Sequence, residues 1–194
     1  MEEVSVAGTL LSAGRELAGT VVVEGEAIAE VVPGRVGRGE VDVMHDGYVA
    51  PGLCDLQVNG AAGHSVTAEP TGLDELEARL VEAGVTSYMP TLITSPPDLR
   101  LAALDRLAAR VADPRSPAAG VHLEGPLLNP RVPGIHDPRL MEDATEGLPA
   151  GFDHPAVRVV TLAPEVAGGR GAIRVLNARG VTVALGHSLS LIHI

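Results

Sequence analysis

Residues 120–126 read Gly-Val-His-Leu-Glu-Gly-Pro (GVHLEGP), a short apolar run that ends in a carboxylate. Side chains along a strand alternate between two faces, so His122 and Glu124 point to the same side. Gly125 and Pro126 end the strand and leave open space around the Glu124 carboxylate. The segment therefore predicts a strand that presents a polar residue at its carboxyl end.

Four other apolar runs repeat this pattern along the chain. These four runs are Leu53–Val58, Thr86–Ile93, Val157–Leu162 and Thr182–Gly186, and residues 120–124 lie between the second and the third of them. The five expected strands begin 25–37 residues apart. Helix signals occupy the connections: a capping box at Thr71–Asp74, a Pro-Pro start at Ser95–Asp98 and a third helix near Gly171–Arg179. This period is typical of βα units that build a parallel sheet.

Two folds use such units, the doubly wound sheet and the (β/α)₈ barrel. A dinucleotide-binding doubly wound sheet has GxGxxG after its first strand, whereas residues 58–63 read VNGAAG. Polar residues gather where the apolar runs end, as in barrel enzymes; they are Gln57, Asn59, Thr91, Thr94, Glu124, Glu165, His187 and Ser188. A full barrel takes about 250 residues. We therefore expect residues 51–188 to form an incomplete (β/α)₈ TIM barrel of about five βα units.

Residues 1–50 differ from the rest in having short, glycine-broken strand signals. Residues 20–24 and 27–32 flank Gly25-Glu26 as a hairpin, and Glu40–Met44 can form another strand. This stretch is too short to bury a core alone. It predicts a small, β-sandwich-like domain in front of the barrel.

Composition excludes several classes of protein. The chain has 194 residues and a net charge of −11, and its 14 basic residues are all arginine. Without lysine, Schiff-base chemistry and the phosphate-binding P-loop are excluded. Nucleic-acid binding is not expected, because there is no basic patch and aromatics make up only 2% of the chain.

The same survey bears on location. A single cysteine, Cys54, rules out an intrachain disulfide, and its apolar run suggests a core position. No apolar run approaches the roughly 18–20 residues that cross a bilayer, and the start lacks the basic and apolar regions of a secretory signal. We expect a cytoplasmic protein without membrane partners.

Three polar residues are the strongest candidates for chemistry. Glu124 and His187 each end an apolar run, and a carboxylate and an imidazole from separate barrel strands can share one metal ion. The alternatives are a surface carboxylate and a structural histidine. His136 follows in a Pro/Gly-rich loop, where it could contact substrate or simply face solvent.

Six segments together resemble the N-acetylglucosamine-6-phosphate deacetylase family of the amidohydrolase superfamily. In chain order they read VAPGLCDLQVNG (49–60), GVTSYMPTLIT (84–94), HLEGPLLNP (122–130), GIHDP (134–138), TLAPE (161–165) and ALGHS (184–188). Each segment is modest alone, but their order and spacing agree with the family over about residues 47–188. The first 46 residues match only in kind.

The resemblance implies the following roles. Glu124 and His187 would bind one divalent metal ion, with zinc expected first and iron or another divalent ion as alternatives. Ile135 and His136 would contact the amino-sugar phosphate. Many amidohydrolases bind a second metal through His-x-His at the first strand, where this chain has Gln57 and Asn59, amides that bind transition metals poorly.

The implied reaction is hydrolysis of N-acetyl-D-glucosamine 6-phosphate to D-glucosamine 6-phosphate and acetate, by a homodimer when complete. The family's general-base aspartate and its third metal ligand, a histidine, come from later barrel strands. No catalytic base is therefore assigned in this chain, and we expect the fragment itself to be inactive. Another amidohydrolase, or a non-catalytic half-barrel that binds metal or sugar phosphate, stays open.

The last six residues are not typical of that family. After Ser188 the chain reads LSLIHI where the family has Asn-Ala-type residues, and this hexapeptide is what a sequencing-library adapter encodes in one reading frame. We expect residues 189–194 to be a non-native tail, on a chain truncated after about the fifth barrel strand.

Overall fold

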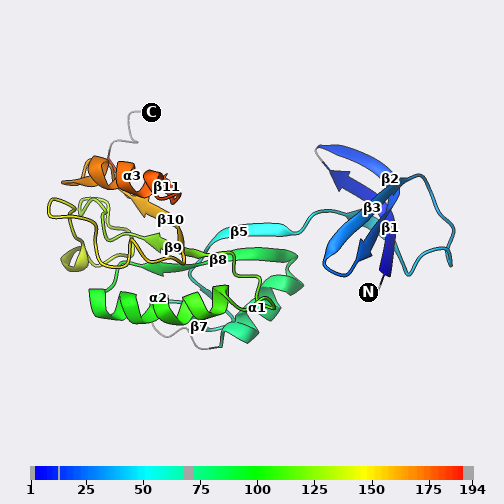
Figure 1. The fold of residues 1–194 in the computed structure, drawn as a ribbon, viewed down its shortest axis with the longest axis horizontal. Helices are drawn as coiled ribbons and strands as arrows, with labels where there is room; N and C mark the ends of the chain where they lie inside the picture. The colour runs from blue at the N-terminus through cyan, green and yellow to red at the C-terminus, as the bar shows by residue number, and fades with distance from the viewer. Residues whose placement is uncertain (1–2, 13, 68–71, 190–194) are drawn as a thin grey trace. The chain divides into compact units, whose positions relative to one another are not determined.

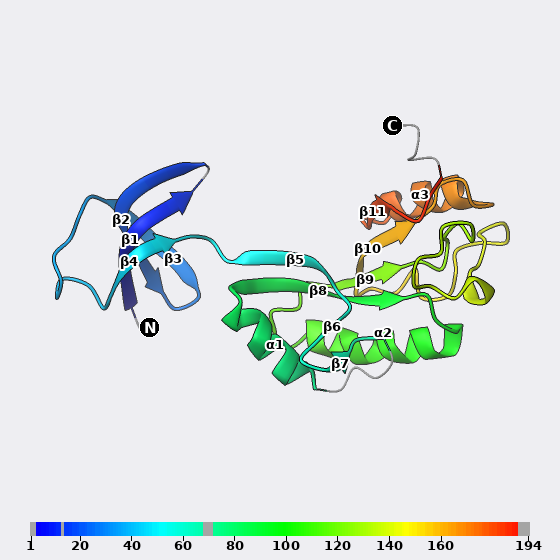
Figure 2. The same cartoon turned by 180° about the vertical axis from the view of Figure 1, so that it is seen from behind.

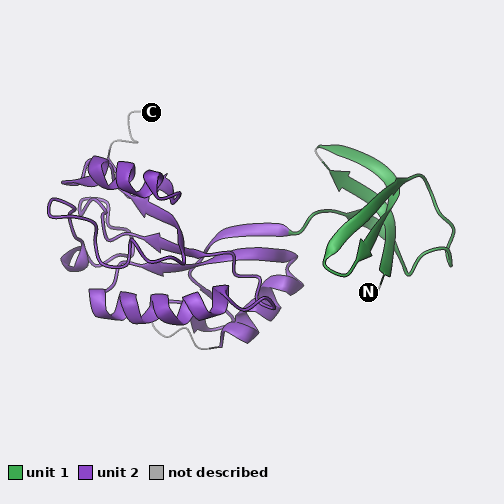
Figure 3. Ribbon diagram, in the orientation of Figure 1, with its two compact units in different colours: residues 1–52 green, residues 53–194 purple. Residues whose placement is uncertain are grey.

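The structure is a computed structural model that describes residues 3–12, 14–67 and 72–189. The chain divides into two compact units, residues 1–52 and residues 53–194 (Figure 3). Of the expected non-native tail, only Leu189 lies among the described residues. Thr71, the first residue of the expected capping box, lies outside them.

The first unit is a four-stranded mixed sheet in the order β3-β2-β1-β4 (Figure 1). Its strands are β1 (Glu3–Ser12), β2 (Arg15–Glu24), β3 (Ala27–Pro33) and β4 (Val43–Val49). The predicted hairpin at Gly25-Glu26 is confirmed, because Glu24 pairs with Ala27 across it. The strand expected at residues 40–44 begins only at Val43, since Glu40 closes a turn on the backbone of Gly37. The sandwich-like description of this domain stays a prediction.

The second unit is a parallel five-stranded sheet in the order β11-β10-β9-β8-β5. The strands are β5 (Leu53–Val58), β8 (Val85–Ile93), β9 (Val121–Glu124), β10 (Val157–Leu162) and β11 (Thr182–Leu185). Each strand pairs with the one before it, with no reversal of order, so the sheet lacks the switch point of a doubly wound fold. It is a partial TIM barrel, as predicted.

Three helices cover one side of this sheet. They are α1 (Leu73–Glu82) on β8, α2 (Pro97–Val111) on β8 and β9, and α3 (Gly169–Ala178) on β11, and Figure 2 shows the first two side by side. All three were expected from the sequence. The start of α1 differs from the expectation, because its N-cap is Gly72, which makes no side-chain cap.

The core lies between the helices and the sheet. Leu76 of α1, Leu104 and Leu107 of α2 and Leu176 of α3 have no exposed surface, and they pack against Tyr88 and other strand residues. Burying such a side chain contributes about 1.5–3 kcal/mol. This apolar layer fixes the strands whose carboxyl ends carry the polar residues discussed below.

Other parts of the second unit are connections. A short hairpin, β6 (Gly60–Ala61) and β7 (His64–Ser65), follows β5, and a single 3₁₀ turn, η1 (Pro138–Leu140), lies in the loop after β9. The expected core position of Cys54 is wrong, because β5 is an edge strand of the described sheet, where it pairs with β8 alone, and its thiol is exposed. None of the described helices is long and apolar enough to cross a membrane.

Candidate metal centre

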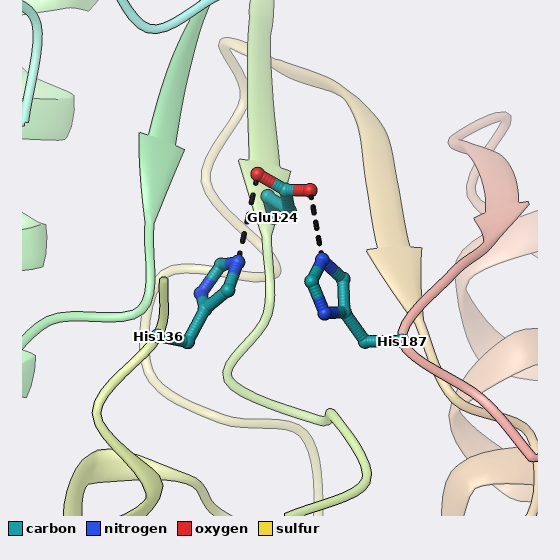
Figure 4. A group of neighbouring side chains, drawn as sticks. All are labelled: Glu124, His136 and His187. Atoms are coloured by element: carbon teal, nitrogen blue, oxygen red, sulfur yellow. Dashed lines mark hydrogen bonds and ion pairs between the residues drawn. The ribbon is translucent and has the colours of Figure 1, made fainter. Parts of the chain in front are cut away.

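Three side chains converge at the carboxyl end of the sheet (Figure 4). Glu124 is the last residue of β9, His187 follows β11, and His136 lies in the loop between β9 and β10. One carboxylate oxygen and one nitrogen of each ring lie within 4.8 Å of one another. The two rings meet edge to face, with centroids 4.7 Å apart. The structure thus brings together three residues that the sequence singled out separately.

The Glu124 carboxylate is the centre of this group. Its Oε1 lies 3.3 Å from His187 Nε2, and its Oε2 lies 3.6 Å from His136 Nε2. Gln57 donates its side-chain amide to Oε2 over 3.1 Å. The neighbouring His136 ring, and less strongly the charge of His187 and the Gln57 amide, lower the pKa of Glu124 to about 2 against the opposing effect of burial. The carboxylate is therefore ionised at neutral pH.

His187 presents one defined nitrogen to this carboxylate. Its Nδ1 lies 2.9 Å from the carbonyl oxygen of Val132. A carbonyl only accepts hydrogen bonds, so Nδ1 carries a proton and the Nε2 of a neutral ring carries a lone pair. The backbone here is left-handed, with φ 48° at His187, and the N–H of Asn129 donates to the His187 carbonyl over 3.0 Å.

This geometry fits a cation between Glu124 and His187. His187 Nε2 and the carboxylate oxygen 3.3 Å away attract each other when the ring is protonated, and when the ring is neutral the two facing lone pairs need a cation between them. Two ligand atoms held by a tetrahedral zinc ion at about 2.0–2.1 Å are themselves about 3.3–3.4 Å apart. Imidazole nitrogen and carboxylate oxygen are also the donors that zinc takes. The donor set and its spacing both suit a divalent ion.

Thr94, the residue that follows β8, contacts Nδ1 of His136, the ring nitrogen that faces away from Glu124. The backbone N–H of Thr94 donates to His136 Nδ1 over 3.3 Å, and the Thr94 hydroxyl lies 2.8 Å from the same nitrogen. The side chain is buried, and its Nε2 has no hydrogen-bond partner within the described structure. A buried polar atom aimed into the site without a partner indicates a place for a ligand atom.

Glycines allow this close packing. Gly134 has φ 58°, and a Cβ placed on it would lie 2.9 Å from Cε1 of His187. Gly125, directly after Glu124, has φ 80°, and a Cβ there would collide with the hydroxyl of Thr94. Only glycine adopts these backbone angles without cost and leaves room for the neighbouring side chain.

The remaining predicted site residues, Gln57, Asn59 and Ile135, are not members of the three-residue group. Gln57 touches Glu124, but the Asn59 side chain is not part of the group, and its buried Nδ2 has no hydrogen-bond partner within the described structure. Ile135 is 77% exposed, although the adjacent His136 is only 3% exposed. The chain therefore turns sharply between a solvent-facing Ile135 and an inward-facing His136.

His122, two residues before Glu124 on β9, lies on the same face of the strand and is buried in a group of hydrogen-bonded residues. His122 Nδ1 lies 3.0 Å from the carbonyl oxygen of Leu56, and its Nε2 lies 2.8 Å from the hydroxyl of Thr161. Burial lowers the pKa of His122, and the Leu56 bond and the Glu124 charge only partly oppose this effect. The His122 ring therefore links β9 to Thr161 of β10 and to Leu56 of β5, the residue before Gln57.

Sequence reasoning missed the groups that orient the site. Thr94 stands out in the sequence only as a polar strand-end residue, and the Val132 carbonyl carries no side-chain signal at all. Arg100, 1% exposed, donates to the carbonyls of Ala150 and Ser95 at 2.8 and 3.1 Å and to Glu142 at 2.9 Å. It fastens the loop that carries His136 to α2, and an arginine in an amphipathic helix gives no hint of that role.

The chain is similar to several sugar-phosphate deacetylases. It is 36% identical over 152 residues to human N-acetylglucosamine-6-phosphate deacetylase, which covers 73% of this chain and 37% of that protein. It is 36% identical over 169 residues to N-acetylgalactosamine-6-phosphate deacetylase of Escherichia coli O157:H7, covering 84% of this chain and 43% of that protein. The chain thus spans less than half the length of these curated relatives. No family model matches the sequence.

Solved structures agree with this similarity. A mutant of N-acetyl-D-glucosamine-6-phosphate deacetylase from Mycobacterium smegmatis, in complex with N-acetyl-D-glucosamine-6-phosphate, superposes with a TM-score of 0.81 at 30% identity. The match covers 97% of this chain and 50% of that enzyme. The deacetylase from Thermotoga maritima matches with a TM-score of 0.80 at 23% identity, which shows a shared fold.

Proposed function

We propose that this chain, a relative of the N-acetylglucosamine-6-phosphate deacetylases, carries a metal centre that serves hydrolysis of N-acetyl-D-glucosamine 6-phosphate to D-glucosamine 6-phosphate and acetate. The observation that carries the proposal is the pair formed by Glu124 and His187, whose ligand atoms face each other at 3.3 Å. The homodimeric state and the cytoplasmic location implied by the family are part of the same proposal.

Glu124 and His187 would hold the ion, through Oε1 and Nε2. Zinc suits this donor set best, with iron or another divalent ion as the alternatives. A divalent ion in such a site supplies a Lewis acid for the acetamide carbonyl and a more acidic water. The chain's own contribution is an ionised carboxylate and a ring whose orientation the Val132 carbonyl fixes.

Gln57 and Asn59 favour one ion over two. Where a second metal would need imidazoles, this chain has amides, and Gln57 already uses its N–H to bind Glu124 Oε2. Amide nitrogens do not coordinate transition metals well. Gln57 therefore acts as an orienting partner of the carboxylate, and the site is mononuclear.

His136 and Ile135 would contact the substrate. His136 turns a buried nitrogen into the site, 3.6 Å from Glu124 Oε2 and without a hydrogen bond among the described residues, while Ile135 offers an exposed apolar side chain at the same loop. Glu124 is the only carboxylate in the group among the described residues, so we assign no general base. The similarity to an N-acetylgalactosamine-6-phosphate deacetylase favours the 4-epimer as the second candidate substrate.

A chimaera tests the reaction. Residues 1–188 would be joined to the part of the Mycobacterium smegmatis deacetylase that this chain does not span, since the two superpose over 97% of this chain. We expect zinc-dependent release of acetate from N-acetyl-D-glucosamine 6-phosphate, abolished by Glu124→Gln. A parallel assay with N-acetyl-D-galactosamine 6-phosphate shows which of the two epimers is the substrate. A chimaera that binds zinc and sugar phosphate without releasing acetate from either epimer would instead indicate a binding module.

A further inference from the structure

We infer that Glu165 is a positioning residue, which holds the backbone turn that aims His187 at Glu124. Glu165 lies in the connection between β10 and α3, and in the sequence it stands out only as a polar residue near the end of an apolar run. The expected effect on metal binding rests on the proposed function, whereas the hydrogen bonds of Glu165 stand by themselves.

The His187 backbone has to be held by its surroundings. Its φ is 48°, a left-handed conformation that residues other than glycine rarely adopt, and such a residue persists only where its neighbours fix it. The residue before it, Gly186, is still tied to the sheet, because its N–H donates to the Leu162 carbonyl over 3.1 Å. The chain therefore leaves the sheet at His187 itself, and the direction of this side chain depends on the contacts of residues 187–189.

The loop after β9 holds His187 on one side. The N–H of Asn129 donates to the His187 carbonyl oxygen over 3.0 Å, and the Val132 carbonyl oxygen lies 2.9 Å from His187 Nδ1. Residues 129–132 form one turn, in which the N–H of Val132 donates to the Asn129 carbonyl over 3.0 Å. The place of this turn therefore sets both the backbone and the ring of His187.

Glu165 fastens that turn to the chain that follows His187. Its Oε1 accepts a hydrogen bond from the Asn129 side-chain amide over 2.8 Å and another from the Leu189 backbone N–H over 2.8 Å. Its Oε2 accepts one from the Ser188 hydroxyl over 2.6 Å. The contact at position 189 needs only a backbone N–H, which every residue except proline has. One carboxylate thus joins the two sides of the strained residue.

Both partners of the central bond have the form that it needs. The Oδ1 of Asn129 accepts the Arg131 backbone N–H over 3.0 Å, which turns the donor Nδ2 toward Glu165. Burial by itself would raise the pKa of the Glu165 carboxyl, but the hydrogen bonds from its three partners, led by the Ser188 hydroxyl, outweigh burial and lower the pKa to about 2. An ionised carboxylate accepts from all three donors at once.

Hydrogen exchange of backbone amides tests these contacts in the metal-free 194-residue chain. We expect Glu165→Ala to make the Asn129 amide exchange at least about 10-fold faster, because its acceptor, the His187 carbonyl, is no longer fixed. The Gly186 amide is the internal control, since it bonds to the sheet directly before His187, and its exchange should not change. Equal acceleration at both amides would mean that the end of β11 has come loose as a whole, and an unchanged Asn129 amide would mean that Glu165 does not hold the turn. Either result overturns the inference.

Zinc affinity tests whether the effect reaches the site. Glu165→Ala should raise the zinc dissociation constant about 10-fold, the lower end of what loss of a partner of a metal ligand costs. Glu165→Gln removes the same negative charge, but its side-chain oxygen can still accept the two N–H bonds and its amide can donate to the Ser188 oxygen. This variant should restore most of the zinc affinity and the slow exchange of Asn129. Equal weakening by both variants would assign the effect to the lost charge and refute a positioning role.

Asn129→Asp sets geometry against charge. The substitution keeps the acceptor for the Arg131 N–H but turns an oxygen toward Glu165 where a donor was. An added negative charge would by itself tighten the binding of a cation, whereas repulsion of Glu165 would release the turn. We expect zinc binding to weaken about 10-fold. Tighter binding, or no change, would contradict the role assigned to Glu165.

Asp143→Ala is the matched control. Like Glu165, the Asp143 carboxylate accepts hydrogen bonds from a backbone N–H and from a hydroxyl, both of Thr145, and these bonds stay within the turn 143–145. The substitution should leave zinc affinity and the exchange of the Asn129 amide unchanged, and an effect equal to that of Glu165→Ala would refute a specific role for Glu165. A chain that takes up no zinc would count against the proposed function, while the exchange of the Asn129 amide would still decide whether Glu165 holds the turn.

Discussion

Gly134 lies so close to His187 that the site depends on the absence of a side chain. We expect Gly134→Ala to destabilise the chain by about 1–3 kcal/mol, because the residue must keep φ 58° and its Cβ would press on the His187 ring. The same pressure should weaken zinc binding. Urea denaturation and a zinc titration measure the two effects.

The control for this substitution is Gly180→Ala. Gly180 has φ 77° after α3, and a Cβ placed on it would meet nothing within 4 Å, so it carries the backbone cost without the contact. It should lose stability and retain zinc affinity. If both variants bind zinc equally well, the Gly134 contact does not shape the site.

Sequence reasoning at this scale was right where side chains carry the signal. Glu124 and His187 follow apolar runs and end parallel strands of the same sheet, so their meeting could be predicted. The Val132 carbonyl is a backbone group that every residue has, and the Thr94 N–H is one that every residue except proline has, so their role emerges only from the path of the loop. Cys54 was misplaced because an apolar run does not tell an edge strand from a central one.

Among the elements, α1, α2 and β8 are joined by one buried carboxylate. Glu77 accepts hydrogen bonds from Tyr88 at 2.9 Å, from Ser116 at 2.7 Å and from Arg110 at 2.8 Å through its Nε. Burial by itself would raise the pKa of Glu77, but the bonds from Arg110, Ser116 and Tyr88 outweigh it and hold the pKa below its usual 4.5. The folded state therefore favours the ionised form.

This network predicts how stability depends on pH. A carboxyl whose pKa is lower in the folded than in the unfolded chain stabilises the fold fully above the unfolded pKa, here about 4.5, and loses that contribution as the pH falls through the folded pKa. We expect Glu77→Gln to cost about 1.5–3 kcal/mol at pH 7 and less at pH 3. Urea midpoints of wild type and variant at the two pH values measure this.

Glu82→Gln serves as the reference, since Glu82 lies on the same helix, with 66% of its side chain exposed, and pairs only with Arg79 among described residues. An exposed pair of this kind contributes about 0–1 kcal/mol. A Glu77→Gln cost that is the same at both pH values would show that the carboxylate's charge is not what matters.

Element boundaries were predictable to the extent that apolar runs define them. The bounds of β5 and β10 equal the apolar runs because both runs are flanked by turn-forming residues. The start of α1 could not be predicted in the same way, because its N-cap is Gly72, with φ 69° and no side-chain cap, and not the cap expected from Thr71. Side-chain caps are one of several ways to start a helix, and sequence alone does not select among them.

For the second unit taken whole, both edges of the described sheet carry apolar side chains. Leu56 on β5 is 55% exposed, and Leu185 on β11 is 47% exposed. An uncovered strand edge offers unpaired backbone groups to another chain. We expect the 194-residue chain to self-associate with rising concentration, and Leu56→Lys or Leu185→Lys to reduce this in sedimentation velocity.

Leu99→Lys is the matched control, because Leu99 is 58% exposed but lies on α2, away from either edge. It should leave association unchanged. Equal relief from Leu99→Lys would mean that general surface hydrophobicity, and not the strand edges, drives association.

The order of the strands also has a consequence in time. Synthesis proceeds from the N-terminus at about 5–20 residues per second, so in this parallel sheet every strand after β5 leaves the ribosome when one strand that it pairs with is already present. Gln57, 67 residues ahead of Glu124, is already present when that carboxylate emerges, whereas His187 follows 63 residues later. That interval is about 3–13 s. During it Gln57, followed by His136 of the loop after β9, can contact the carboxylate, and the cation-binding pair is complete only once β11 has docked.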